Sequence, residues 1–207
     1  MIRSELNFEQ VYAIFQPRIY RYLERLIGIN EVEDVTQEVF IKVGKALDKF
    51  GNKSQLSTWI YQIATNTAID RMRSRSYKQD AITKYYPTDG ELNEKNMCFA
   101  NKPLSIEEQV IRKEMNECIQ GYVAVLPENY RIVFVLSEME RFKVSEIAAL
   151  LGLSVNTVKM RLHRAKKRLK ELLLANCNFY RTECNELACE PKGPAARKIK
   201  PFSATRH

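Results

Sequence analysis

A basic segment near residue 160 carries the side chains best suited to binding a nucleic acid. Between Ser154 and Lys170 the chain holds seven lysine or arginine residues and no acidic residue. Lysine and arginine neutralise phosphates, and arginine or asparagine can also bind base edges in a major groove. On a helix, the side chains turned away from the buried face would be Asn156, Lys159, Met160, Arg161, His163, Arg164 and Lys167. This pattern favours a DNA-reading helix over the alternative, a solvated basic helix in an ordinary bundle.

The apolar residues around this segment predict the two helices that would position it. They recur every three or four residues on both sides of Gly152, which is typical of helices that bury one face. These residues are Ile147, Leu150 and Leu151 before the glycine, and Val158, Leu162, Ala165 and Leu169 after it. Gly152 suits the turn between the helices, and Ser154 is a favourable N-cap for the second helix. The sequence therefore predicts a helix-turn-helix whose second helix enters a DNA major groove.

The charge of the whole chain supports a polyanionic partner. The 207 residues carry a formal net charge of +8 at pH 7. A second basic group lies at residues 71–78, and an acidic group lies at residues 31–38. Two separate basic groups suggest two contacts with one nucleic acid rather than one diffuse patch.

The cysteines and the hydropathy indicate a reduced, cytoplasmic protein. The five cysteines are an odd number and are not spaced like a disulfide framework. No apolar run approaches the roughly 18 residues that a membrane span needs. We therefore expect a cytoplasmic protein without a membrane span, in a compartment where thiols stay reduced.

The chain is predicted to be all-α, with two small helical domains joined by a flexible linker. It contains only seven glycines and seven prolines, and strand-like alternation is nearly absent. We expect helices at residues 5–27, with a possible break at Pro17, at residues 31–49, and from a cap at Ser57 or Thr58 to about residue 75. The predicted divisions are a first helical domain at 1–76, a linker at 77–104, a helix-turn-helix domain at 105–174 and a disordered, cysteine-containing tail at 175–207.

The composition argues against catalysis and against a bound metal or cofactor. The chain has two histidines, His163 on the basic helix and His207 at the last position. No pair of carboxylates has metal-ligand spacing near a basic cleft, so a metal-dependent nuclease is not expected. A stand-alone helix-turn-helix transcription regulator is the other alternative. It would need a ligand-binding or phosphoacceptor domain, and residues 1–75 lack the β-α alternation of such a domain.

Motifs in both halves of the chain narrow the function. Residues 34–40 read DVTQEVF, and residues 57–70 read STWIYQIATNTAID. In the second half, residues 126–131 read LPENYR, residues 146–148 read EIA and residues 157–162 read TVKMRL. With these motifs in this order, residues 5–174 resemble the bacterial RNA polymerase sigma factors of the extracytoplasmic-function (ECF) group of the sigma-70 family. The resemblance implies a protein that binds core RNA polymerase and directs promoter-specific transcription initiation.

The resemblance also implies roles for particular residues. Those expected to bind the clamp helices of the polymerase's largest subunit are Asp34, Gln37 and Glu38. Those expected to bind the minus-ten promoter element are Asn52, Lys53, Ser54, Trp59, Asn66, Arg71 and Arg73. Those expected to bind the minus-thirty-five element are Ser154, Asn156, Thr157, Lys159, Met160, Arg161, Arg164 and Lys167. Promoter DNA, the flap of the second-largest subunit and an anti-sigma factor are the further expected partners.

Two interpretations stay open at this point. Trp59 suits a place in the core about as well as a stack on DNA. Cys177, Cys184 and Cys189 could bind a metal, act as a thiol switch or be inert, because C-x-x-C spacing is missing and acidic residues lie among them.

Overall fold

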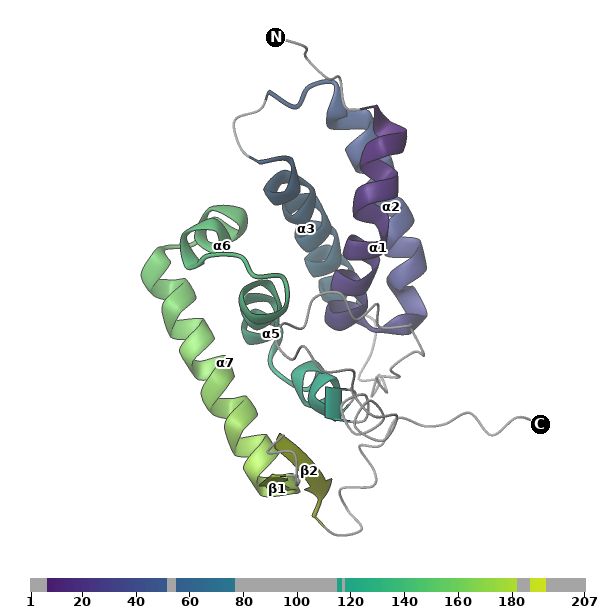
Figure 1. Cartoon of the computed structure of the whole chain (residues 1–207). Coiled ribbons are helices and arrows are strands. Elements are labelled where there is room, and N and C mark those ends of the chain that lie inside the picture. The colour runs from purple at the N-terminus through teal and green to yellow at the C-terminus, as the bar shows by residue number, and fades with distance from the viewer. Residues whose placement is uncertain (1–6, 52–54, 77–114, 117, 182–186, 193–207) are drawn as a thin grey trace, which may run out of the picture.

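The computed structural model describes residues 7–51, 55–76, 115–116, 118–181 and 187–192. These residues form two helical units that contact one another, with a short hairpin at the end of the second (Figure 1). The first unit consists of α1 (Phe8–Ile27), α2 (Ile29–Leu47) and α3 (Leu56–Ser76). The second consists of a helical segment at residues 118–124, α5 (Glu128–Phe134), the π-helical turn η1 (Val135–Met139), α6 (Val144–Leu151), α7 (Val155–Asn176), β1 (Cys177–Arg181) and β2 (Leu187–Pro191). The prediction of two helical units is confirmed.

Gly28 makes the sharp reversal between α1 and α2. Its φ of 82° lies in the left-handed region, which glycine adopts without strain. Its N–H donates to the carbonyl oxygen of Glu24 at 2.9 Å and so closes the last turn of α1. Because α2 begins at the next residue, Ile29, the two helices lie antiparallel and close together.

Two local features of the first unit differ from the sequence prediction. The possible break at Pro17 is absent, because α1 runs through Pro17 to Ile27. The burial of apolar residues on both sides of the proline outweighs the loss of one backbone hydrogen bond. α3 begins at Leu56, so Ser57 and Thr58 lie inside the helix and not at its cap.

Buried hydroxyl groups on α1 and α3 satisfy one another in the core. The hydroxyls of Tyr22 and Thr65 lie 2.7 Å apart, and Thr65 also reaches the carbonyl oxygen of Tyr61 at 2.6 Å. Burial raises the pKa of Tyr22 above its ordinary value, so this phenol stays neutral. These hydrogen bonds remove most of the cost of placing hydroxyls in an apolar core.

The helix-turn-helix forms as predicted. Gly152 ends α6 with a φ of 64°, and the N–H of Leu153 donates to the carbonyl oxygen of Ala148 at 2.9 Å, as in a Schellman motif. The hydroxyl of Ser154 then accepts the N–H of Thr157 at 3.1 Å and caps α7. The predicted apolar stripes are buried at Ile147, Leu150, Val158, Ala165 and Leu169.

The two helical units are joined by contacts centred on the carboxylate of Glu140. One of its oxygens accepts from Nη1 of Arg25 at 2.8 Å, and the other accepts from the hydroxyl of Tyr61 at 2.5 Å. The Glu140 side chain is only 12% exposed, so these two donors replace the water that the carboxylate loses. The ring of Tyr61 also meets the ring of Phe142 edge-on, with 4.9 Å between their centroids.

The π-helical turn η1 positions Glu140 for this contact. The N–H of Glu140 donates to the carbonyl oxygen of Val135 at 3.0 Å, the i to i+5 bond of a π-helix. Directly after it, Arg141 has a φ of 63° and turns the chain toward α6. On α5, Nη1 of Arg131 donates to the carbonyl oxygen of Leu26 at 2.7 Å, a second bond between the units.

The prediction of a disordered tail from residue 175 is wrong for residues 175–181 and 187–192. α7 ends at Asn176, and β1 and β2 then pair antiparallel. The hairpin forms because it buries Cys177 and Ala188, and because the N–H of Lys192 donates to the carbonyl oxygen of Asn176 at 2.7 Å. The predicted linker at 77–104 and the predicted start of the second domain at 105 lie outside the described residues.

Replacing Gly152 with alanine should lower the free energy of unfolding by about 1 kcal/mol, because a β-carbon is disfavoured at positive φ. Apart from the adjoining backbone, no heavy atom of the described residues lies within 4 Å of the position that this β-carbon would take, so the loss reports backbone strain. Urea unfolding followed by circular dichroism measures it. The control Gly152→Asn should lose less, since asparagine tolerates the left-handed region. Equal losses in the two variants would contradict this reading of the turn.

Replacing Glu140 with glutamine should lower the free energy of unfolding by about 1–2 kcal/mol, because Arg25 then keeps a buried charge without its carboxylate. The matched control is Glu138→Gln. Glu138 pairs with Lys166 at 2.9 Å within the second unit, and both side chains are more than a third exposed. That change should cost less than about 0.5 kcal/mol. Urea unfolding of both variants tests the contrast, and a smaller loss for Glu140→Gln than for the control would refute it.

Candidate nucleic-acid interface

α7 presents the predicted minus-thirty-five residues to solvent on one side. Val158 and Ala165 are fully buried on the other side, against α5 and α6, and this fixes the rotation of the helix. The exposed predicted residues are Ser154, Asn156, Lys159, Met160, Arg164 and Lys167. Thr157 and Arg161 are half-buried beside them. The structure therefore brings all eight predicted residues together on α7 and its N-cap, between Ser154 and Lys167.

The charges on α7 fall into two groups. The second half of the helix pairs within the protein, with Lys166 on Glu138 at 2.9 Å and Lys167 on Glu171 at 4.0 Å. Partial burial alone would raise the pKa of Glu138, but the hydrogen bond from Lys166 holds that pKa below its ordinary value. Among the described residues, neither Arg161 nor Arg164 pairs with an acidic side chain. Two cations of the second half are thus neutralised within the described part of the protein, whereas Arg161 and Arg164 are not.

Three of the predicted minus-ten residues share one face of α3. Trp59, Asn66 and Arg73 are seven residues apart, a spacing that keeps side chains on one side of a helix. Asn66 and Arg73 are exposed. Trp59 is half-buried, and its ring lies against Phe50 with 5.0 Å between centroids. Trp59 is thus partly in the core and partly accessible. The predicted residues Asn52, Lys53 and Ser54 lie outside the described residues.

Arg71 does not join that face. It points to α2, where its guanidinium lies 3.8 Å from carboxylate oxygens of both Glu31 and Glu38. Its side chain is 35% exposed. The structure therefore separates Arg71 from the other minus-ten residues and links it to the predicted polymerase-binding group.

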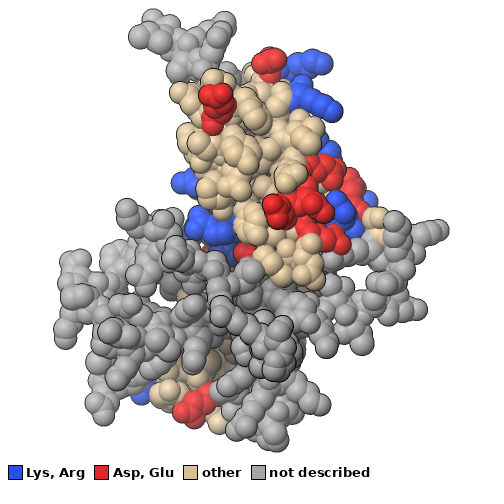
Figure 2. Space-filling view, turned by 90° about the vertical axis from the view of Figure 1, so that its right-hand side faces the viewer, with Lys and Arg blue, Asp and Glu red and all other residues tan. Residues whose placement is uncertain are grey.

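The predicted polymerase-binding residues form a continuous strip on α2. Asp34 and Gln37 are exposed, and Glu38 forms an ion pair with Lys42 one turn later, with 2.7 Å between Oε1 and Nζ. On the side of the molecule formed by α1 and α2, acidic side chains gather with basic ones among them (Figure 2). Ile41, one turn after Gln37 on the same strip, is 57% exposed. We did not predict that Ile41 belongs to this strip. The available signal was an apolar residue at a position where the helical spacing places exposed polar residues.

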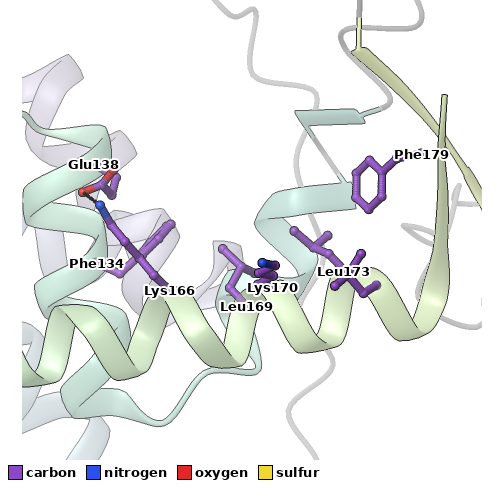
Figure 3. Close-up of a pocket in the computed structure, with 8 residues that line it drawn as sticks. Phe134, Glu138, Lys166, Leu169, Lys170, Leu173 and Phe179 are labelled. Carbon is purple, nitrogen blue, oxygen red and sulfur yellow. Dashed lines mark ion pairs between the residues drawn. The ribbon is translucent and has the colours of Figure 1, made fainter. Parts of the chain in front are cut away.

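A second feature that we did not predict is a groove of about 340 Å³ between α7 and the α5–η1 segment. Its walls are mainly apolar, with Lys166 and Glu138 paired at one end and Phe179 of β1 at the other (Figure 3). The apolar residues are Phe134, Leu169, Leu173, Leu174 and Phe179. Leu174 is 52% exposed, and this leucine outside the buried stripe of α7 was the available sign.

Neither a metal-ligand cluster nor a membrane-spanning helix is found among the described residues. Within them, no three histidine, cysteine, aspartate or glutamate side chains are arranged to hold a metal ion. None of the described helices combines the length and the hydropathy of a membrane-spanning segment.

Solved structures share this fold. RpoE of Bartonella quintana, in complex with the anti-sigma factor NepR, superposes with a TM-score of 0.61 at 21% identity, covering 82% of this chain and 98% of that one. CnrH, in complex with the cytosolic domain of CnrY, superposes with a TM-score of 0.56 at 24% identity, covering 81% and 88%.

Sequence comparison identifies the family. Residues 11–77 match Sigma-70 region 2, and residues 116–169 match Sigma-70, region 4. The ECF RNA polymerase sigma factor SigW of Bacillus subtilis (strain 168) is 34% identical over 167 residues, 80% of this chain and 88% of SigW. The ECF RNA polymerase sigma-E factor of Escherichia coli (strain K12) is 30% identical over 168 residues, 78% and 84% of the two chains. The two helical units are thus sigma regions 2 and 4, and the chain belongs to the ECF sigma factors of RNA polymerase.

Proposed function

We propose that this sigma factor binds core RNA polymerase and directs it to promoters through two separate DNA contacts. The observation that carries the proposal is that one chain contains both units. The region 2 unit exposes a polar strip on α2, and the region 4 unit exposes a basic helix, α7. Since recognition and strand opening need no reacting group from this chain, its role is non-enzymatic. We infer that it works in the cytoplasm, where RNA polymerase and promoter DNA meet.

Polymerase binding is assigned to Asp34, Gln37 and Glu38 on α2. They project at positions i, i+3 and i+4, so one face offers two carboxylates and an amide to basic clamp helices. Ile41 extends this face by one turn and adds apolar area at its edge. A polar strip with an adjoining apolar residue suits a protein partner better than a nucleic acid.

Minus-ten recognition is assigned to the face of α3 that carries Trp59, Asn66 and Arg73, together with the preceding loop. Holding an unpaired base requires a stacking surface and contacts to the backbone phosphates. The paired rings of Phe50 and Trp59 supply aromatic surface at the start of the helix, and Arg73 supplies a cation near its end. Arg71 holds α3 against α2 through its ion pairs with Glu31 and Glu38, on a side of α3 away from this face.

Minus-thirty-five recognition is assigned to the first half of α7. The exposed side chains there include Asn156 and Arg164, which can form paired hydrogen bonds with adenine and guanine respectively. Ser154 and Thr157 lie at the helix N-terminus, where hydroxyl and N–H groups favour phosphate. The arrangement is that of a recognition helix entering a major groove.

Two further protein partners are proposed, the first of them at region 4. The apolar groove between α7 and α5–η1 is proposed to receive the flap of the polymerase's second-largest subunit, because its leucine and phenylalanine walls suit an apolar helix. An anti-sigma factor is proposed as a regulator, because the structurally similar RpoE and CnrH were solved with NepR and with the cytosolic domain of CnrY.

Polymerase binding gives the first test. The double variant Asp34→Ala, Gln37→Ala should bind core polymerase about 10–100-fold more weakly, because hydrogen bonds from charged partners are lost. Fluorescence anisotropy of labelled protein titrated with core enzyme measures this. The control Glu9→Ala removes an exposed carboxylate from the first turn of α1 and should keep the affinity. Equal weakening by the control would point to net charge and refute the assignment.

Promoter reading gives the second test. In transcription reconstituted with core polymerase and a promoter library, Arg164→Ala should cost about 1–3 kcal/mol and relax preference at one upstream base pair. The half-buried Arg161 should show the same effect at another base pair if it reaches a base edge. The control Lys170→Ala should weaken all promoters alike. Unchanged promoter strength and preference in an Arg161→Ala, Arg164→Ala double variant would contradict the role of this face.

A further inference from the structure

Three cysteines from separate segments meet at the end of the second unit. Cys118 lies on the helical segment 118–124, Cys177 lies where α7 passes into β1, and Cys189 lies on β2. All three are free thiols. Neither DNA reading nor polymerase binding uses them.

Cys177 is the centre of this cluster. Its thiol is close enough to interact with the thiols of both Cys118 and Cys189. The hydroxyl of Tyr122, one helical turn after Cys118, lies 3.7 Å from the Cys177 sulfur. Cys177 is 2% exposed, whereas Cys118 and Cys189 are both partly accessible. One buried thiol therefore faces two thiols that solvent can reach.

The register of the hairpin decides which pair can bond. Cys189 pairs with Phe179, and Cys177 pairs with Pro191, so Cys177 and Cys189 are diagonal neighbours on one face of the hairpin. Diagonal neighbours have α-carbons about 7–8 Å apart. A disulfide usually needs about 4.4–6.8 Å. The hairpin thus disfavours a bond between Cys177 and Cys189, and Cys118, which lies on a different segment, carries no such restriction.

We propose that Cys118 and Cys177 form a reversible disulfide that ties the end of the DNA-reading helix to the helical segment 118–124. The oxidant is a low-molecular-weight disulfide. The Cys118 thiolate attacks one of its sulfurs, forms a mixed disulfide and releases the first small thiol. The Cys177 thiolate then attacks the Cys118 sulfur and releases the second small thiol. Two protein thiols are oxidised, one small disulfide is reduced, and two protons pass to the small thiolates.

The environment of the thiols sets the conditions for this exchange. Burial, together with the neighbouring Cys177 and Cys189 thiols, raises the pKa of Cys118 to about 12. Little thiolate is present at neutral pH, so the exchange is slow and the pair stays reduced in an ordinary cytoplasm.

A bond between Cys118 and Cys177 would stabilise region 4. It would close a loop that holds α5, η1, α6 and α7, and closing a long loop restricts the unfolded chain. The thermal midpoint of the oxidised protein should rise by at least about 5 °C, and a reductant should reverse the rise.

Peptide mapping of the full chain tests the pairing. Trypsin separates the cysteines, because residues 114–131 contain only Cys118 and residues 171–181 contain only Cys177, while Cys184 and Cys189 share residues 182–192. After incubation with oxidised glutathione at pH 8, mass spectrometry without reduction should show 114–131 joined to 171–181. Treatment with a reductant should separate the two peptides.

Two serine variants complete the test. Cys118→Ser should lose both the joined peptide and the rise in thermal midpoint, whereas the matched control Cys189→Ser should keep both. Joining of 171–181 to 182–192 in place of 114–131, or no joined peptide at all, would overturn the proposal. The map of the unaltered protein decides the pairing even if a variant fails to fold. Neither measurement involves polymerase or promoter, so the result is independent of the proposed function.

Discussion

The arrangement of the two helical units depends on one nearly buried carboxylate, that of Glu140. A carboxylate loses several kcal/mol of hydration on burial, so it stays charged only where donors replace the water. Arg25 and Tyr61 do this from α1 and α3, at 2.8 and 2.5 Å. Glu140 therefore holds region 4 against α1 and α3 of region 2, while α7 keeps its own basic side exposed.

The sequence predicted the features that depend on neighbouring residues. The turn at Gly152 and the cap at Ser154 could be read directly, because a left-handed glycine and a capping hydroxyl act within one turn of helix. The exposed face of α7 followed from the spacing of its buried residues. The Glu140 contact could not be read in this way, because its partners lie 115 and 79 residues away along the chain. The hairpin was missed because two five-residue strands are too short to show a clear alternation.

The side chain of Arg71 lies on a different surface from the one that its position in the sequence predicted. Its position in the sequence placed it with the DNA-binding residues of α3, but its side chain lies between Glu31 and Glu38 of α2. Basic residues close in sequence can point to different surfaces, since a helix turns by about 100° per residue. For this chain, the candidate minus-ten face is therefore narrower than the basic segment that suggested it, and the candidate polymerase face is less acidic than its composition indicates.

The direction of the Glu140 side chain depends on the π-helical turn η1, and the contact between the two helical units depends on that direction. A π turn contains one residue more than the α turn it replaces, so every side chain after it is rotated by about 100° from the continued α-helical phase. Glu140 is the first residue after η1, and it owes its direction to that extra residue. Restoring an ordinary α-helical turn by a one-residue deletion in η1 would leave the composition almost unchanged, yet it would point the carboxylate away from Arg25 and Tyr61. The junction between the regions is thus encoded by the length of a segment as much as by the identity of its residues.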